Sequence, residues 1–286
     1  MSLRTYYACY PCLLRQAVEA VDFVGLDEEN ARDILNDTMR ILIDIDGSLT
    51  SAEIAALIHQ NIIKKVGGVD PYKQAKIDSY QSAMEFYDEA KEIVAKADDP
   101  LAAAIKVSTA GNIIDFGPTA NFDLRKTLQT AFHEPFAIFD YEPFRERLKD
   151  AKHILFLADN AGETVFDRVL IEEMGRPLEY VVKKAPIMND ALYEDAEMTK
   201  MPDYVKIIDN GSAIQGTVLH RCSKEFLEKY KAADLIISKG MANYETLPEE
   251  KERTFFLLKI KCDSVSKLAG IPTGSFVFQQ GGLFSR

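Results

Sequence analysis

Short runs of apolar residues recur through the second half of the chain, and segments with helical periodicity separate them. Their composition is typical of strands that are buried on both faces of a sheet. The runs are 154–158, 180–182, 205–208, 235–237 and 275–278, and the helical patterns are 164–174, 190–198, 223–230 and 262–268. Because strands that alternate with helices need crossover connections, the sequence predicts an α/β domain with a doubly wound, Rossmann-like, mainly parallel sheet.

The first half of the chain shows helical patterns alone. The segment from Thr50 to Glu53 is a capping box, and Asp70-Pro71 and Asp99-Pro100 each place an N-cap before a proline, which predicts helices over 71–95 and 100–110. No stretch alternates with a period of two for long enough to indicate a strand. A chain of 286 residues has room for about two domains. We therefore expect an all-helical domain over 1–148 and a Rossmann-like α/β metal- and phosphate-binding domain over 149–286.

Composition excludes several classes of protein. Lys and Arg number 34 against 45 Asp and Glu, a net charge of −11 without a basic stripe, so nucleic acid is not an expected partner. No segment reaches the roughly 18 consecutive apolar residues of a membrane span, and the N-terminus lacks the apolar core of a secretory signal, so we expect a cytoplasmic protein. The four His and four Cys are few, which favours oxygen ligands for any metal.

Polar residues directly follow the apolar runs, and ligands of open parallel sheets bind at the carboxyl ends of the strands. We therefore predict that these residues line one site. They are Asp159-Asn160, Lys183-Lys184, Asp209-Asn210 and Ser238-Lys239-Gly240. Carboxylates, carboxamides and lysines on one edge suit a hard cation together with a phosphate rather than an apolar ligand.

The segment from Asp159 to Glu163 is the most informative motif. Asp159 and Asn160 offer two oxygen ligands, Gly162 lets the backbone approach a ligand closely, and the helix that follows presents N–H groups to an anion. Such residues also serve as ordinary helix caps. Asn189-Asp190, however, repeats the pairing after the next run, which is expected in the neighbouring strand. The two pairs together predict an oxygen-ligand site for Mg²⁺ or a similar ion.

Two further segments carry polar residues of interest. Lys239 lies beside Gly240 on a strand-to-helix loop, where a lysine is a natural phosphate contact, although an exposed lysine without a function is equally common there. Asn112 and Asp115 lie three residues apart between two glycines, where a helix is expected to end. The glycines fit a helix C-terminus, but they do not explain a polar pair in an apolar stretch.

These segments together resemble the DUF89 family, whose members are also called damage-control phosphatases. The resemblance rests on the order and spacing of motifs over most of the chain: Cys9-x-x-Cys12, Gly111-Asn112-Ile113-Ile114-Asp115, the segment from Asp159 to Glu163, Asn189-Asp190, Lys239-Gly240 with Asn243-Tyr244, and a late strand from Phe255 to Cys262. The C-x-x-C is similar to that of the mainly prokaryotic subfamily. The resemblance implies a helical N-terminal unit on a Rossmann-like domain, and a divalent-metal-dependent phosphatase of small phosphorylated metabolites such as sugar phosphates.

The resemblance also implies roles for single residues. The metal ligands would be Asp159, Asn160 and Asp190, and the lysine that contacts phosphate would be Lys239. The chain departs from the family pattern where Ala191-Leu192 replaces a frequent Val-Thr, a difference that bears on the support of Asp190. Because metal preference varies within the family, the single divalent ion is Mg²⁺, Mn²⁺, Co²⁺ or Ni²⁺.

We therefore expect metal-assisted hydrolysis of a phosphomonoester, with Asp159 and Glu163 as the candidate catalytic residues. Either water attacks with Glu163 or Asp209 as the base, or Asp159 attacks and forms an aspartyl-phosphate, and the sequence leaves both routes open. The predicted substrate contacts are Asn112, Asp115, Asn189, Lys239 and Asn243.

Two other functions are compatible with these features. A Rossmann-like sheet also suits an S-adenosylmethionine-dependent methyltransferase, but the turn after the first run has one glycine where that cofactor usually needs several. A metal-dependent metabolite-binding or sensor protein would bind the same ligands without turnover. The physiological substrate and the oligomeric state are not encoded in any motif.

Overall fold

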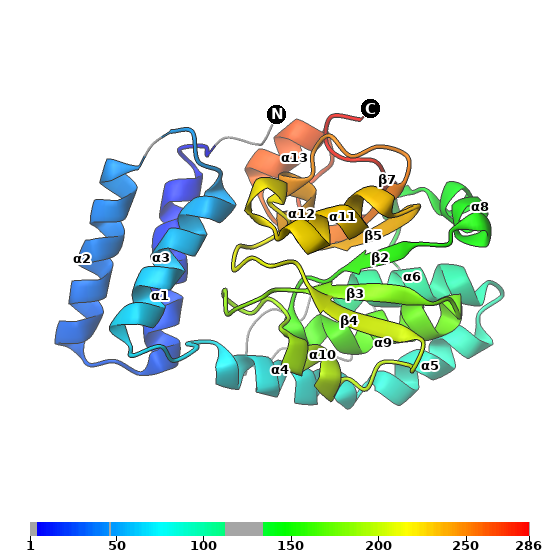
Figure 1. Cartoon of the computed structure of the whole chain (residues 1–286), viewed down its shortest axis with the longest axis horizontal. Helices are drawn as coiled ribbons and strands as arrows, with labels where there is room; N and C mark the ends of the chain where they lie inside the picture. The colour runs from blue at the N-terminus through cyan, green and yellow to red at the C-terminus, as the bar shows by residue number, and fades with distance from the viewer. Residues whose placement is uncertain (1–4, 46, 112–133, 286) are drawn as a thin grey trace.

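The computed structural model describes residues 5–45, 47–111 and 134–285 (Figure 1). The N-terminal helices are α1 (Cys9–Val24), α2 (Glu28–Asp44), α3 (Ser51–Lys65), α4 (Lys73–Met84), α5 (Tyr87–Lys96) and α6 (Pro100–Gly111). Strands and helices then alternate: β1 (Phe136–Phe139), α8 (Tyr141–Asp150), β2 (Ile154–Leu157), η1 (Ala161–Glu163), α9 (Thr164–Met174), β3 (Leu178–Val182), α10 (Tyr193–Met198), β4 (Val205–Asp209), η2 (Leu219–Arg221), α11 (Lys224–Ala232), β5 (Leu235–Lys239), α12 (Gly240–Thr246), β6 (Thr254–Lys259), α13 (Asp263–Ala269) and β7 (Phe276–Gln280). Within these ranges, no helix combines the length and apolarity that crossing a membrane requires.

The strands in the described part of the chain form one seven-stranded sheet in the order β1-β7-β6-β5-β2-β3-β4. Neighbouring strands are parallel except for β6 and β7, which are antiparallel. This confirms the predicted doubly wound, mainly parallel α/β fold. Because β2 lies between β5 and β3, the loops that follow these three strands meet at one edge of the sheet.

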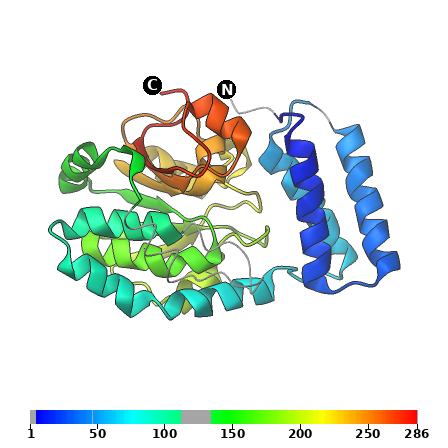
Figure 2. The same ribbon diagram turned by 180° about the vertical axis from the view of Figure 1, so that it is seen from behind.

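Helices cover both faces of the sheet (Figures 1 and 2), and the strands bury alternate side chains in two cores, one on each face. On one face, Phe156 and Tyr180 pack with helices α4, α5, α6, α8 and α9. On the other face, Leu157 and Val181 pack with α11, α12 and α13. Successive residues of a strand point to opposite faces, so strands covered on both sides are apolar throughout. Burial of each such side chain contributes about 1.5–3 kcal/mol, which fixes the frame that carries the loops.

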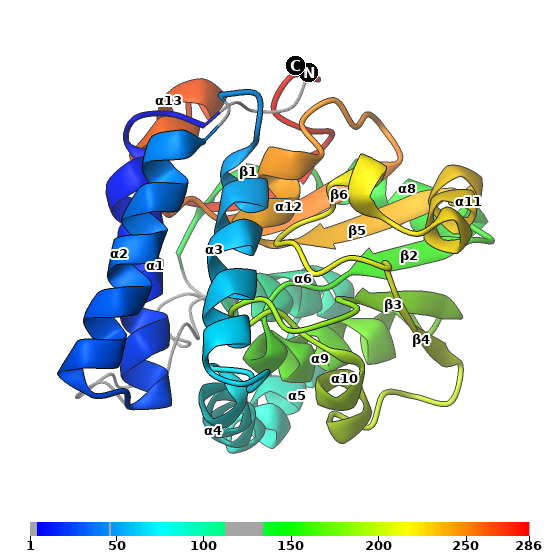
Figure 3. The ribbon, with the colours of Figure 1, turned by 60° about the vertical axis from the view of Figure 1, so that its left-hand side comes forward.

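Helices α1, α2 and α3 have a core of their own and lie across the carboxyl ends of the strands (Figure 3). Ile34 of α2 and Ile58 of α3 belong to this core, and so does Met188 from the loop after β3. The three helices therefore pack directly against a loop at the carboxyl edge. Helices α4 to α6 instead share the core of the sheet. The domain boundary near residue 148 stays a prediction, since α1 to α3 have their own core whereas α4 to α6 share the core of the sheet.

Three local predictions are wrong. Residues 136–139 are not helical but form the edge strand β1, which pairs with β7 and is too short to show a period of two. The helix expected over 71–95 is two helices, because a turn at Glu85 and Phe86 lets α4 and α5 both pack on one core. Asn189-Asp190 does not open a helix. Asp190 pairs instead with Asn160 in an isolated β-bridge, and α10 begins at Tyr193.

Candidate active site

The loops after β2 and β3 are bound to each other at the carboxyl edge of the sheet. Asn160 and Asp190 form an antiparallel bridge. The backbone N–H of Ala191 donates to the carbonyl oxygen of Asp159 at 2.8 Å, and that of Ala161 donates to the carbonyl oxygen of Asn189 at 2.9 Å. The structure therefore brings together the three residues that were predicted as metal ligands. Their strands are neighbours, as expected.

Asp190 has a buried carboxylate with few partners. Its residue is 1% exposed, and neither carboxylate oxygen has a hydrogen-bond partner among the described residues. The ammonium of Lys183 lies 3.5 Å from Oδ2. Burial raises the pKa of Asp190 to about 6, although Lys183 and the nearby amide of Gln215 lower it. Since a buried carboxylate without donors is costly, this group fits a ligand of a divalent cation.

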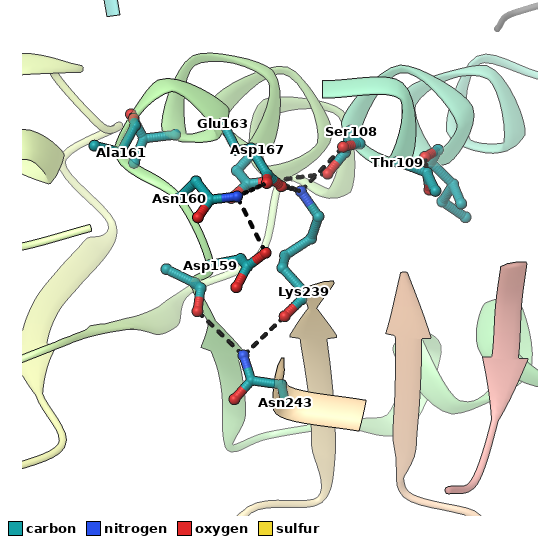
Figure 4. A network of polar contacts seen from close by, with 12 residues as sticks. Ser108, Thr109, Asp159, Asn160, Ala161, Glu163, Asp167, Lys239 and Asn243 are labelled. Atoms are coloured by element: carbon teal, nitrogen blue, oxygen red, sulfur yellow. Dashed lines mark hydrogen bonds and ion pairs between the residues drawn. The ribbon is translucent and has the colours of Figure 1, made fainter. Parts of the chain in front are cut away.

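Asp159 and Asn160 follow β2 side by side (Figure 4), and the backbone bridge joins Asn160 to Asp190. The amide nitrogen of Asn160 donates to Oδ2 of Asp159 at 3.3 Å and to Oε1 of Glu163 at 2.8 Å, so its oxygen is the atom with which it would bind a cation. Gly240 packs directly on Asp159: a Cβ at this position would lie 1.9 Å from Oδ2 of Asp159, and its φ is +80°. Glycine is therefore required here both by the close approach and by the backbone conformation.

The ammonium of Lys239 lies inside a fully bonded group that we call the Lys239 cluster, made of Lys239, Glu163, Asp167 and Ser108 (Figure 4). Lys239 is 0% exposed and donates to Oε2 of Glu163 at 2.9 Å, to Oδ1 of Asp167 at 2.5 Å and to the carbonyl oxygen of Ser108 at 3.0 Å. Asp167 also accepts from Ser108 Oγ and from the hydroxyl of Tyr180, each at 2.8 Å. Every polar hydrogen of the ammonium thus has an acceptor.

Charges within the Lys239 cluster stabilise one another. Burial alone would lower the pKa of Lys239, but the carboxylates of Asp167 and Glu163 raise it above its ordinary value. Burial also raises the pKa of Asp167, and the neighbouring ammonium opposes that rise. The lysine is therefore charged, and the carboxylates of Asp167 and Glu163 balance its charge inside the protein. The predicted roles of Lys239 as a phosphate contact and of Glu163 as a base stay predictions.

Asn243 connects three loops of the site. Its amide nitrogen donates to the carbonyl oxygens of Ala158 at 3.2 Å and Lys239 at 2.8 Å, and its oxygen accepts from the hydroxyl of Thr217 at 2.7 Å. These contacts hold the ends of β2 and β5 and the loop after β4 together. Its role as a substrate contact is a prediction that these contacts do not test.

The other predicted substrate contacts divide into two groups. Asn189 is buried within the loop that carries the predicted metal ligand Asp190. Asn112 and Asp115 lie outside the described residues, so the proposed contacts of this pair stay predictions.

Comparison with known proteins identifies the family of this chain. The chain matches the family model described as damage-control phosphatase ARMT1-like domain over residues 5–277. The chain belongs to this family. A damage-control phosphatase of Pyrococcus horikoshii is 32% identical over 284 residues, which cover 96% of this chain and 97% of that protein. An uncharacterised protein of Methanocaldococcus jannaschii is 35% identical over 283 residues, with 94% and 93% covered.

A solved structure gives the same result for the fold. The crystal structure of a DUF89 family protein from Pyrococcus horikoshii superposes with a TM-score of 0.90 at 30% sequence identity, covering 98% of this chain and 99% of the other. The resemblance drawn from the motifs, to DUF89 and the damage-control phosphatases, is thereby confirmed.

Asp167 is a charged residue of this family member that the sequence did not assign to the site, and Lys183 was predicted there only together with Lys184. Lys183 is 4% exposed, whereas the side chain of its neighbour Lys184 is 64% exposed and pairs with Asp209. Asp167 lies one turn after Glu163 on α9, among buried apolar residues. A charge in such an apolar helix needs a buried partner, and this signal could have indicated Asp167.

The predicted ligand set of this ARMT1-like chain contains two carboxylates and one carboxamide. Among the described residues, no three His, Cys, Asp or Glu side chains are grouped so that they could hold a metal ion. Any metal bound at Asp190 would thus depend on the amide oxygen of Asn160 as well as on carboxylates.

An open hollow of ≈ 610 Å³ lies at the opposite end of the sheet. It is lined by residues that include Arg147, Lys152 and Asp234, and the latter two directly precede β2 and β5. None of the predicted site residues that the structure describes lines it. Because ligands of such sheets bind at the carboxyl ends, this hollow is a surface feature rather than the candidate active site.

Proposed function

We propose that this protein is a divalent-metal-dependent phosphatase that hydrolyses small phosphorylated metabolites such as sugar phosphates. The proposal is carried by the buried carboxylate of Asp190, whose oxygens have no hydrogen bond of good geometry among the described residues, in a loop bridged to Asn160. Membership of the ARMT1-like family and the damage-control phosphatase of Pyrococcus horikoshii support the same reaction class. Three oxygen ligands suit Mg²⁺ or Mn²⁺ and leave coordination positions for a substrate.

The residues of the chain divide the work of this reaction. When bound, the divalent ion would polarise a phosphoryl oxygen. Asp159, Asn160 and Asp190 would hold that ion, and Glu163 would keep Asn160 in place by accepting from its amide nitrogen at 2.8 Å.

Attack on phosphorus has two candidate routes. In the first route, a carboxylate such as that of Glu163 removes a proton from the attacking water. In the second, Asp159 attacks phosphorus and forms an aspartyl-phosphate. Acid quenching during turnover of a substrate with labelled phosphate separates them. Label on the protein, lost in Asp159→Ala, supports the second route, and its absence supports the first.

The function is tested with metal-stripped protein and a panel of substrates. We expect phosphate release from p-nitrophenyl phosphate and sugar phosphates with at least one of Mg²⁺, Mn²⁺, Co²⁺ and Ni²⁺, and baseline release after chelation. Asp159→Ala should lose this activity, while the exposed control Glu228→Gln should keep it. Metal-independent release, or a normal rate in Asp159→Ala, would refute the metal-site assignment.

Two outcomes would point to the other functions. Tight ligand binding without turnover under every ion would favour a metabolite-binding or sensor protein. Tight binding of S-adenosylmethionine in a calorimetric titration would favour methyl transfer.

A further inference from the structure

Three lysines with buried side chains surround the candidate site, and the ammonium groups of two of them each pair with two carboxylates. Lys239 has the two carboxylates of the Lys239 cluster. Lys76 of α4 lies 2.9 Å from Oδ2 of Asp70 and 3.5 Å from Oδ2 of Asp195. Each of these ammonium groups faces two negative charges, so its charge is already balanced within the protein.

Lys183 has a different environment. Its ammonium donates to the carbonyl oxygen of Gly216 and lies 3.5 Å from Oδ2 of Asp190. Within the described ranges, no second carboxylate forms an ion pair with it. Its one negative partner is therefore a residue that we assign to the metal. A cation bound by Asp190 would neutralise that carboxylate and leave the buried ammonium without a counter-ion.

The backbone places Lys183 firmly at the edge of the site. Its N–H donates to the carbonyl oxygen of Ala191 at 2.9 Å, and it forms a parallel bridge with Leu192, so it is tied to the loop that carries Asp190. On its other side, Gly216 is packed so closely that a Cβ there would lie 2.4 Å from the carbonyl oxygen of Ala242 in α12. Lys183 thus lies between the loops that follow β3, β4 and β5.

We propose that Lys183 is the residue that binds the phosphate group of the substrate, and that its ion pair with Asp190 is exchanged for this phosphate when the cation binds. The proposal deepens the proposed function, on which it rests. A divalent ion and an ammonium side by side in a buried site require an anion between them, and a phosphate with two negative charges contacts both. A neutral or cationic metabolite would not satisfy the same site.

The experiment compares Lys183→Met, which keeps the length of the side chain, with the wild type. Mn²⁺ affinity is measured first by electron paramagnetic resonance, and the affinity of the Mn²⁺-loaded protein for inorganic phosphate is then measured by calorimetry. We expect Lys183→Met to weaken phosphate binding about tenfold to hundredfold, the loss of one charge-assisted contact. Mn²⁺ affinity should stay within about threefold or become tighter, since removing a positive charge next to Asp190 favours a cation.

Three variants complete the design. Lys183→Arg keeps the charge and should retain most of the phosphate affinity. Lys183→Gln keeps a donor for Gly216 and should lose affinity as Lys183→Met does, which covers the case that Lys183→Met fails to fold. Lys184→Met removes the neighbouring exposed lysine and should bind phosphate as the wild type does.

Each result decides the role of Lys183. A parallel loss of Mn²⁺ and phosphate affinity would show that Lys183 only positions Asp190, and unchanged phosphate affinity would show no contact; either overturns the proposal. Because phosphate binding is measured without turnover, a failure of the Lys183 assignment can be distinguished from a failure of the proposed phosphatase function. A protein that hydrolyses no substrate but loses phosphate binding in Lys183→Met refutes the phosphatase function and keeps the assignment of Lys183.

Discussion

Lys239 is the last residue of β5 and Lys183 directly follows β3, the two strands that flank β2, yet their surroundings differ. The ammonium of Lys239 has three acceptors, of which two are buried carboxylates. That of Lys183 has one carbonyl oxygen and one carboxylate at 3.5 Å, and the oxygens of this carboxylate have no hydrogen-bond partner among the described residues. The Lys239 cluster is complete as it stands, whereas the Asp190–Lys183 pair is not.

The difference separates structure from function within a single edge of the sheet. A buried ion pair that is fully hydrogen-bonded holds its partners in one arrangement, and breaking it is costly. A buried carboxylate without donors lowers the stability of the protein unless a ligand supplies the missing charge. We therefore expect changes in the Lys239 cluster to affect folding, and changes at the Asp190–Lys183 pair to affect ligands.

The largest expected effect is on catalysis in Asp190→Asn. The change removes one negative charge from the predicted metal site, so we expect phosphatase activity to fall by about a thousandfold or more. The metal-free variant should be at least as stable as the wild type at pH 7, because burial of this carboxyl disfavours its charged form. Initial rates with Mn²⁺ and urea unfolding with chelator measure the two effects.

A matched control is Glu194→Gln, which removes an exposed carboxylate from α10 four residues away. It should change neither rate nor stability noticeably. If Asp190→Asn were clearly less stable than the wild type without metal, its carboxylate would be a structural group like those of the Lys239 cluster, and the comparison would fail.

The second effect is on stability in Lys239→Met. The variant leaves Glu163 and Asp167 buried without a cation, so the free energy of unfolding should fall by about 3–5 kcal/mol. Lys183→Met should lose less than about 1.5 kcal/mol when both are compared with saturating Mn²⁺, because the ion then compensates Asp190. Urea unfolding at pH 7 measures both. An equal loss in the two variants would contradict the distinction drawn here.

The sequence predicted the Asp190 side of this comparison better than the Lys239 side. The rule that strand ends of a parallel sheet meet at one edge marks Asp159 and Asn160, and Asn189-Asp190 repeats the pairing after the next strand. Asp167 joins Ser108, 59 residues away, and Lys239, 72 residues away, through packing of α6, α9 and β5. No local pattern specifies which helix face meets which strand, so this cluster required the structure.

The same limit applies to neighbouring residues and to short elements. The rule for strand ends marks Lys183 and Lys184 equally, and only the path of the chain beyond β3 shows which side chain is buried. The edge strand β1 has four residues and pairs with β7, 140 residues further along, so its sequence alone resembles any apolar segment. The sequence predicted the buried strands and the helices between them, because their patterns recur along the chain. It did not predict elements such as β1, whose structure depends on a partner far away in the sequence.

The third effect follows from the close contact between Gly240 and Asp159. Gly240→Ala would place a methyl group against the carboxylate and also strain a backbone with a φ of +80°. We expect about a tenfold to hundredfold loss of activity and about 1–3 kcal/mol of stability. Gly175→Ala is the matched control, because Gly175 has a φ of +57° but no atom within 4 Å of an added Cβ.

Gly175→Ala should therefore lose only the roughly 1 kcal/mol that a left-handed backbone costs and keep full activity. Rates with Mn²⁺ and thermal unfolding of both variants measure the difference. Equal activity in the two would mean that the position of Asp159 does not matter for the reaction.

The smallest effect concerns Glu245 of α12, a carboxyl group that forms no ion pair within the described residues. Burial raises the pKa of Glu245 to about 7, and the hydroxyl of Ser51 opposes this rise. An acid with a raised pKa in the folded state contributes stability at low pH that is lost as pH rises from about 4.5 through about 7, because the unfolded chain releases the proton first.

Glu245→Gln should therefore become more stable relative to the wild type between pH 5 and pH 8, by less than about 1 kcal/mol since the residue is partly exposed. The exposed Glu252→Gln should show no such trend in urea unfolding across this range. Because Glu245 lies away from the predicted ligands, its variant should leave Mn²⁺ affinity unchanged. If Glu245→Gln leaves Mn²⁺ affinity unchanged, burial alone does not make a carboxyl group a metal ligand. The loops after β2 and β3 would then be what makes Asp190 one.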